Sequence, residues 1–198
     1  MNLFPGDSLK RGIPLIQADL SPTHYFVVWL PPPDKNPPCM IYFSFVESDK
    51  PLIIGIGNSL MGDDGVGPYV ISLLEQKSDI SADLLVLSTP GFALMTHFQG
   101  RKKVIIVDAA SFEGAPGTVA RITRDMIGKK PGSGFSLHDA DPFAVHDRAI
   151  ELGLAPDELV VYAIRFENIA PREGLSPLVE AGARRAADLI AEELCSNA

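Results

Sequence analysis

Residues 51–76, P-L-I-I-G-I-G-N-S-L-M-G-D-D-G-V-G-P-Y-V-I-S-L-L-E-Q, join a short apolar run to a stretch of helical periodicity through a glycine-rich turn. The apolar run at 51–57 is typical of a buried strand. After the turn, Val66, Val70 and Leu74 recur at the spacing that places side chains on one face of a helix. This step from strand to helix favours an α/β fold.

The same alternation continues along the chain. Further strands are predicted over 83–88, 103–110, 117–124 and 158–166. Helices are predicted over 92–98, over 141–152 and from the Ser176–Pro177 pair onward, which suits a helix cap and first turn. The run at 103–110 is continuously apolar, as central parallel strands are, whereas 117–124 alternates like an edge strand. These elements predict a three-layer α/β/α sandwich with a mostly parallel sheet.

The first fifty residues differ in character from the rest. The proline-rich segment L-P-P-P-D-K-N-P-P-C-M at 30–40 breaks regular structure, and only 25–30 has the composition of a strand. We therefore expect a poorly ordered N-terminal extension at 1–50 and one folded domain at 51–198. Met40, just before an apolar run, is a possible alternative start of translation.

Composition narrows the classes of partner. The chain has 46% hydrophobic and 21% charged residues, which suits a soluble domain with a sizeable core. Its net charge of -8 argues against nucleic acid and anionic membrane as partners. No apolar run is long enough to span a bilayer and no signal-peptide pattern is present, so we expect a cytoplasmic protein. Cys39 and Cys195 lack C-x-x-C spacing and a neighbouring histidine, so we expect two free thiols.

Three polar residues follow predicted strands, where parallel sheets bind their ligands. Asp64, preceded by Asp63, lies in the turn after the first strand, and Asp108 ends the run at 103–110. His138 lies between the edge strand and the next helix. We expect Asp64, Asp108 and His138 to open onto one rim of the sheet.

A cation fits this rim better than a phosphate. The turn lacks the third glycine of G-x-G-x-x-G and the Lys-Ser/Thr of a Walker loop. A carboxylate about 5 Å from a phosphate charge costs on the order of 3 kcal/mol at an effective dielectric constant of about 20. Two carboxylates and one imidazole instead suit nickel, zinc or cobalt. A nucleotide-binding α/β protein is the less favoured interpretation.

Each candidate also has a purely structural explanation. Asp63 and Asp64 both precede a helix, where aspartate acts as a cap. A lone histidine such as His138 is more often a surface or hydrogen-bonding residue than a ligand. Asp108 is the hardest to explain in this way, because a carboxylate at the end of a buried strand needs a partner to offset its desolvation.

Four motifs occur in one order between about Leu52 and Leu194, namely G-I-G-N-S-L-M-G-D-D-G-V-G, V-I-I-V-D-A-A, S-L-H-D-A-D and E-G-L-S-P-L-V-E-A. Together they resemble the motifs of the hydrogenase maturation proteases. No serine-protease elbow and no H-E-x-x-H motif competes with this resemblance. The T-P-G at 89–91 departs from the family, whose members commonly have a glycine-rich or G-T turn there.

The resemblance implies a five-stranded twisted sheet between helices, with Asp64, Asp108 and His138 as the metal-recognising and catalytic triad. It implies an aspartic-type endopeptidase that removes the C-terminal extension of a nickel-iron hydrogenase large-subunit precursor. The nickel is carried by that precursor, and no tightly bound organic cofactor is expected. Either Asp64 or Asp108 is a candidate general base. The alternative is a non-catalytic metal-binding module that docks on the precursor and checks nickel insertion.

Overall fold

The computed structural model describes residues 15–20, 23–30, 39–45, 48–88, 91, 93–127, 136–137 and 141–196. The chain divides into two compact units, Met1–Glu47 and Ser48–Ala198. No helix among the described residues is long and apolar enough to cross a membrane.

The first unit holds a three-stranded antiparallel sheet of order β1-β2-β3. Its strands are β1 (Leu15–Leu20), β2 (Thr23–Leu30) and β3 (Cys39–Phe45). The sequence pattern indicated one strand here, at 25–30, which lies within β2. Strands β1 and β3 were not predicted, because the prolines at 31–33 and 37–38 indicated an irregular segment. The division near residue 50 and the poor order of the extension stay predictions.

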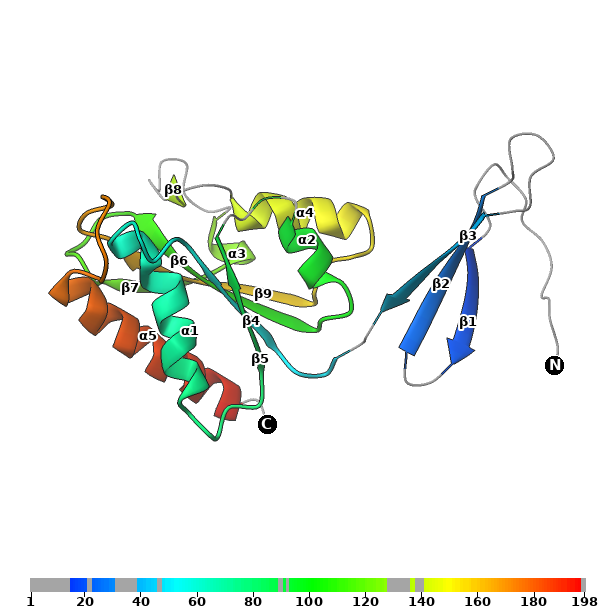
Figure 1. Ribbon diagram of the computed structural model, residues 1–198, viewed down its shortest axis with the longest axis horizontal. Coiled ribbons are helices and arrows are strands. Elements are labelled where there is room, and N and C mark those ends of the chain that lie inside the picture. The colour runs from blue at the N-terminus through cyan, green and yellow to red at the C-terminus, as the bar shows by residue number, and fades with distance from the viewer. Residues whose placement is uncertain are drawn as a thin grey trace. The chain divides into compact units, whose positions relative to one another are not determined.

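The second unit is built on one twisted sheet of order β5-β4-β6-β9-β7 (Figure 1). Strands β5, β4, β6 and β9 are parallel, and β7 is antiparallel to β9. This confirms the predicted mostly parallel five-stranded sheet. A two-residue strand, β8, also pairs with the end of β6 and was not predicted. The strands are β4 (Leu52–Ile56), β5 (Asp83–Leu87), β6 (Lys103–Ser111), β7 (Val119–Thr123), β8 (Ser136–Leu137) and β9 (Glu158–Arg165).

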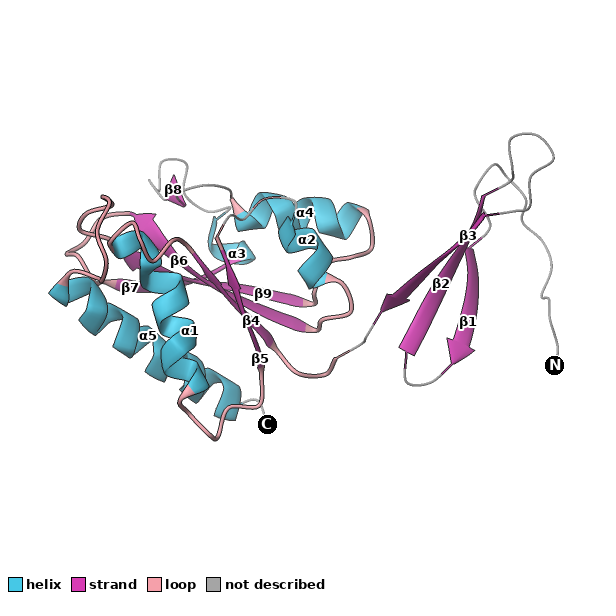
Figure 2. Cartoon of the chain, viewed as in Figure 1, coloured by secondary structure: helices cyan, strands magenta, loops and turns pink. Residues whose placement is uncertain are grey.

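Helices cover both faces of this sheet, which confirms the three-layer architecture (Figure 2). Helices α1 and α5 pack together on one face, and α2 and α4 pack together on the other. The helices are η1, a 3-10 turn (Asp63–Gly65), α1 (Val66–Glu75), α2 (Ala93–Phe98), α3 (Arg124–Ile127), α4 (Pro142–Glu151) and α5 (Pro177–Ser196).

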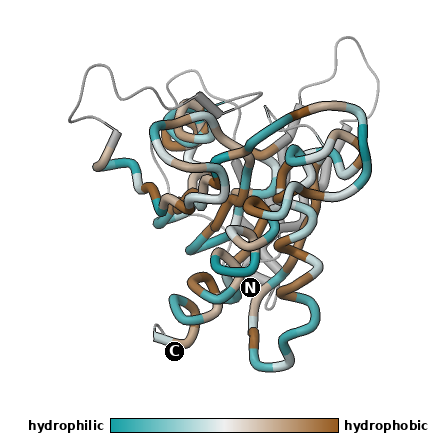
Figure 3. Tube along the Cα trace, turned by 90° about the vertical axis from the view of Figure 1, so that its left-hand side faces the viewer, coloured by the Kyte–Doolittle hydropathy of each residue, from teal (hydrophilic) through white to brown (hydrophobic). Residues whose placement is uncertain are grey.

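The central strands are largely apolar because each face of the sheet has its own core. Ile105 and Val107 of β6 pack into the cluster under α1 and α5, whereas their neighbour Ile106 packs into the cluster under α2 and α4. Helix α5 is amphipathic, and in Figure 3 its tube alternates between hydrophobic and hydrophilic colours toward the C-terminus. Successive strand side chains point to opposite faces, so two buried faces require a continuous apolar run.

The start of α1 lies directly on the sheet. A Cβ atom added to Gly67 would lie 2.7 Å from the Val107 carbonyl oxygen of β6, and it would also clash with the backbone of Ile56 in β4. Only glycine allows this approach. The turn between β4 and α1 is thereby fixed over the carboxyl ends of both strands.

Candidate functional site

The two adjacent aspartates of the glycine-rich turn have different partners. Both lie in η1, where successive side chains point about 120° apart because a 3-10 helix has three residues per turn. Asp64 is partly exposed, and its Oδ2 accepts a 2.8 Å hydrogen bond from the amide of Asn58 in the same turn. Asp63 is fully buried and is directed toward residues 167–176. The acid pair therefore consists of one buried and one accessible carboxylate.

Five hydrogen bonds hold the buried carboxylate of Asp63. Its Oδ1 accepts from the amide of Ser176 at 2.6 Å and from Nη2 of Arg172 at 3.3 Å. Its Oδ2 accepts from the amides of Glu167 and Asn168 and from the Ser176 hydroxyl, each at 2.9 Å. Burial raises the pKa of Asp63, but the hydrogen bonds outweigh burial and leave the pKa below its ordinary value. Asp63 is thus structural, as a bridge between two loops and not as the expected helix cap.

Backbone hydrogen bonds join the same two loops. The amide of Gly62 donates to the Arg172 carbonyl at 2.9 Å, and the Arg172 amide donates to the Leu60 carbonyl at 3.0 Å. The Asp63 amide donates to the Asn168 carbonyl at 3.3 Å. The turn that carries Asp64 is therefore fastened along its length to the segment between β9 and α5.

Asp108 lies in β6, near its carboxyl end, and is buried. Turn η1 contacts β6, and Gly67, three residues after Asp64, lies against the strand at Val107. The structure therefore brings the segments that carry Asp64 and Asp108 together, as the sequence predicted for neighbouring parallel strands.

His138 lies outside the described residues. Its chain neighbour Leu137 belongs to β8 and pairs with Ala110, two residues beyond Asp108. Among the residues that the structure does describe, no group of three histidine, cysteine or acidic side chains is arranged to hold a metal. The three-residue metal site stays a prediction.

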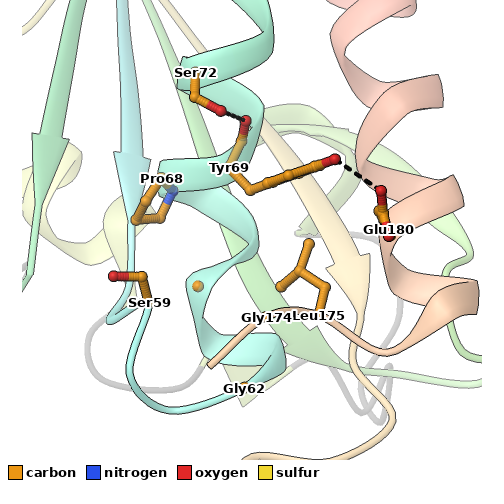
Figure 4. Close-up of a pocket in the computed structure, with 9 residues that line it drawn as sticks. Ser59, Gly62, Pro68, Tyr69, Ser72, Gly174, Leu175 and Glu180 are labelled. Carbon is orange, nitrogen blue, oxygen red and sulfur yellow. Dashed lines mark hydrogen bonds between the residues drawn. The ribbon is translucent and has the colours of Figure 1, made fainter. Parts of the chain in front are cut away.

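A pocket of about 410 Å³ opens beside the turn (Figure 4). Three of its polar side chains are already hydrogen-bonded: the Tyr69 hydroxyl donates to Glu180 at 2.9 Å, and the Ser72 hydroxyl donates to the backbone carbonyl of Tyr69 at 2.7 Å. Arg184 donates to both the hydroxyl oxygen of Tyr69 and the carboxylate of Glu180. Sequence reasoning missed this pocket, since its walls come from distant segments. It is lined by Ser59, Gly62, Gly65, Pro68, Tyr69, Ser72, Gly174, Leu175 and Glu180.

Comparison with known proteins decides the family. The family model for the HycI hydrogenase maturation protease matches residues 68–193. The chain belongs to the hydrogenase maturation protease family. It is therefore a hydrogenase maturation endopeptidase, and so a hydrolase.

Individual members of the family support the assignment. The hydrogenase 2 maturation protease of Escherichia coli is 29% identical over 66% of this chain and 81% of its own length. The hydrogenase maturating endopeptidase HybD from E. coli is similar in structure, with a TM-score of 0.62 and 26% identity over 75% of this chain and 93% of that one. The nickel-iron hydrogenase maturation protease HybD from Thermococcus kodakarensis has a TM-score of 0.59 and 25% identity over 73% of this chain and 99% of that one. None of these maturation proteases favours the non-catalytic docking module.

Proposed function

We propose that this maturation protease removes the C-terminal extension of a nickel-iron hydrogenase large-subunit precursor, and that it recognises nickel already bound to that precursor. The observation that carries the proposal is the meeting of the Asp64 turn with the Asp108 strand at the carboxyl end of a parallel sheet. This is where ligands bind in such sheets. The named relatives that act in hydrogenase maturation support the choice of substrate.

In this proposal, Asp64, Asp108 and His138 contact the nickel of the precursor from the protease side. Carboxylate oxygen and imidazole nitrogen are donors that nickel accepts. The contact places the scissile peptide bond at the site and holds it there for attack by water. Asp64 or Asp108 takes a proton from the attacking water, and the departing amine receives a proton as the carbon–nitrogen bond breaks.

The pocket beside the turn offers room for a side chain of the bound precursor. It shares Gly62 and Gly65 with the turn that carries Asp64, so a precursor bound at Asp64 lies next to it. Because Tyr69, Ser72 and Glu180 are already hydrogen-bonded, an apolar side chain is the occupant that suits the pocket best.

Mass spectrometry of the precursor tests the proposal. A nickel-loaded precursor incubated with the protein should lose the mass of its C-terminal extension, whereas a nickel-free precursor should not. Asp64→Asn, Asp108→Asn and His138→Ala should each abolish the loss while keeping the circular dichroism of the folded protein. The matched control is Asp157→Asn at an exposed carboxylate, which should cleave like the unsubstituted protein.

Two results would contradict the proposal. An unchanged precursor mass, with stable binding to the protein, would favour the docking module. Equal cleavage of nickel-loaded and nickel-free precursors would remove nickel from the recognition step.

A further inference from the structure

We propose that Asp63 is a positioning residue, which holds Asp64 in its working place by anchoring the turn at 57–65 to the segment at 167–176. This inference rests on the proposed function, because it concerns the placement of a carboxylate that the proposed reaction uses. Asp63 itself is fully buried, so it acts on the reaction only through its neighbour.

The turn at 57–65 is held only in part by its own hydrogen bonds, which the amides of Asn58, Leu60, Met61 and Gly65 donate within it. Gly57 and Gly62 have φ values of 133° and 64°, which lie in the region that favours glycine and that other residues rarely adopt. Between β4 and α1 the only helical segment is the three-residue η1. Contacts from outside the turn therefore add to these internal hydrogen bonds in fixing its conformation.

Asp63 ties the turn to the neighbouring segment through five side-chain hydrogen bonds. Each of its five hydrogen bonds comes from 167–176, and all five partners are donors. A carboxylate is the side chain that suits a site of donors only, since it accepts at both oxygens and has no hydrogen of its own when ionised. Hydrogen bonds to an ionised acceptor are also the stronger ones.

The link from Asp63 to Asp64 is a single peptide bond within one 3-10 turn. On its other side Asp64 is held by the Asn58 amide, and its carbonyl oxygen lies against Gly57, where a Cβ atom would clash. Asp64 therefore has little freedom while Asp63 stays anchored. A displacement of about 1 Å at a reacting group costs on the order of 100-fold in rate, so even a partial release of Asp63 should be visible in turnover.

The substitution Asp63→Asn tests the inference in the full chain. An amide has the same shape but must turn its NH2 group toward one set of donors, so it loses hydrogen bonds without opening a cavity. We expect a fall of at least about 10-fold in cleavage rate per folded molecule on nickel-loaded precursor. The amide of Asn58, which donates to Asp64, should also exchange its hydrogen faster in the free protein.

Two further variants separate positioning from general stability. Ser176→Ala removes the hydroxyl donor to Asp63 but keeps the amide donor, so it should give a smaller fall in rate, of roughly 2- to 5-fold. It also provides the test if Asp63→Asn does not fold. The control is Glu193→Gln, near the end of α5, which disrupts the hydrogen bonds of Glu193 with Lys103 and Tyr162. It should lower the free energy of unfolding and leave the cleavage rate per folded molecule unchanged.

The inference is overturned if folded Asp63→Asn cleaves at the normal rate and its Asn58 amide exchanges at the normal rate. It is also overturned if Glu193→Gln loses as much rate per folded molecule as Asp63→Asn. If the unsubstituted protein fails to cleave the precursor, the proposed function is wrong, and hydrogen exchange at Asn58 still decides whether Asp63 holds the turn.

Discussion

The hydroxyl of Tyr162 donates a 2.6 Å hydrogen bond to Oε2 of Glu193, and so joins β9 to the last turns of α5. Glu193 also accepts from Lys103 at 2.7 Å and from Nε of Arg121 at 2.7 Å. Lys103 opens β6, whereas Asp108 lies near the other end of that strand. A stabilising charge cluster and the candidate site thus occupy opposite ends of the central strand.

Glu193 should make the free energy of unfolding fall as the pH is lowered. The hydrogen bond from Arg121 is the main cause that lowers the pKa of Glu193, to about 2. Hydrogen bonds from Lys103 and Tyr162 lower this pKa further, and together they outweigh burial, which raises it. An unfolded glutamate has a pKa of about 4.3. The folded state therefore binds fewer protons, and the contribution of Glu193 is complete above about pH 5 and is lost as pH falls toward 2. We expect that contribution to be roughly 1 to 3 kcal/mol after allowance for solvent screening.

Urea unfolding from pH 7 to pH 3 measures this effect. Glu193→Gln should lower the free energy of unfolding at pH 7 and should flatten its decline with acid. The control is Glu151→Gln, at an exposed pair with Arg148, which should change the curve by less than about 0.5 kcal/mol. Parallel curves for Glu193→Gln and the unsubstituted protein would contradict the assignment.

The strands of the main sheet, apart from the two-residue β8, were predictable because each has either a largely apolar run or an apolar–polar alternation, bounded by turn residues. The run at 103–110 became β6, and the alternating stretch at 117–124 became the antiparallel edge strand β7. A strand buried on both faces has a continuous apolar run, whereas a strand buried on one face alternates between apolar and polar residues. The β8 strand has two residues and no period, so no pattern could reveal it.

The roles of Asp63 and Asp64 were harder to separate, since both precede the same helix. Their directions depend on η1, a short turn that follows Gly62 at a φ of 64°. The decisive partner of Asp63 is Ser176, more than a hundred residues away, and Ser176 was expected only to cap α5. Local spacing identifies the acid pair, but only the tertiary contact shows which acid is buried.

A methyl group at Gly67 should push the start of α1 away from the sheet. In Gly67→Ala the new Cβ meets backbone atoms of Ile56 and Val107, which cannot rotate away as a side chain can. We expect a loss of at least about 3 kcal/mol in the free energy of unfolding, at the upper end for overpacking, measured by urea unfolding. Gly153→Ala is the control, because its Cβ meets open space and its positive φ alone costs about 1 to 2 kcal/mol. Equal losses in both variants would show that α1 adjusts to the methyl group.

A chain that begins at Ser48 should fold and cleave like the full chain. Among the side chains that the structure describes, both buried clusters of the second unit consist of residues from Leu52 onward, and the Ser48 amide is bonded to the Gly100 carbonyl at 3.3 Å. Removing 1–47 therefore keeps every described side chain of both clusters. We expect a melting temperature within about 2 °C of the full chain, which corresponds to less than about 1 kcal/mol for a domain of this size.

A chain that begins at Met40 provides the comparison. It keeps most of β3 but removes β2, the strand with which β3 pairs along its whole length. The retained strand then presents unpaired backbone groups, which promote association between chains. Light scattering should show more association for this chain than for the one that begins at Ser48, with equal cleavage per folded monomer. Loss of cleavage in the chain that begins at Ser48, with its fold intact, would instead assign residues 1–47 to recognition of the precursor.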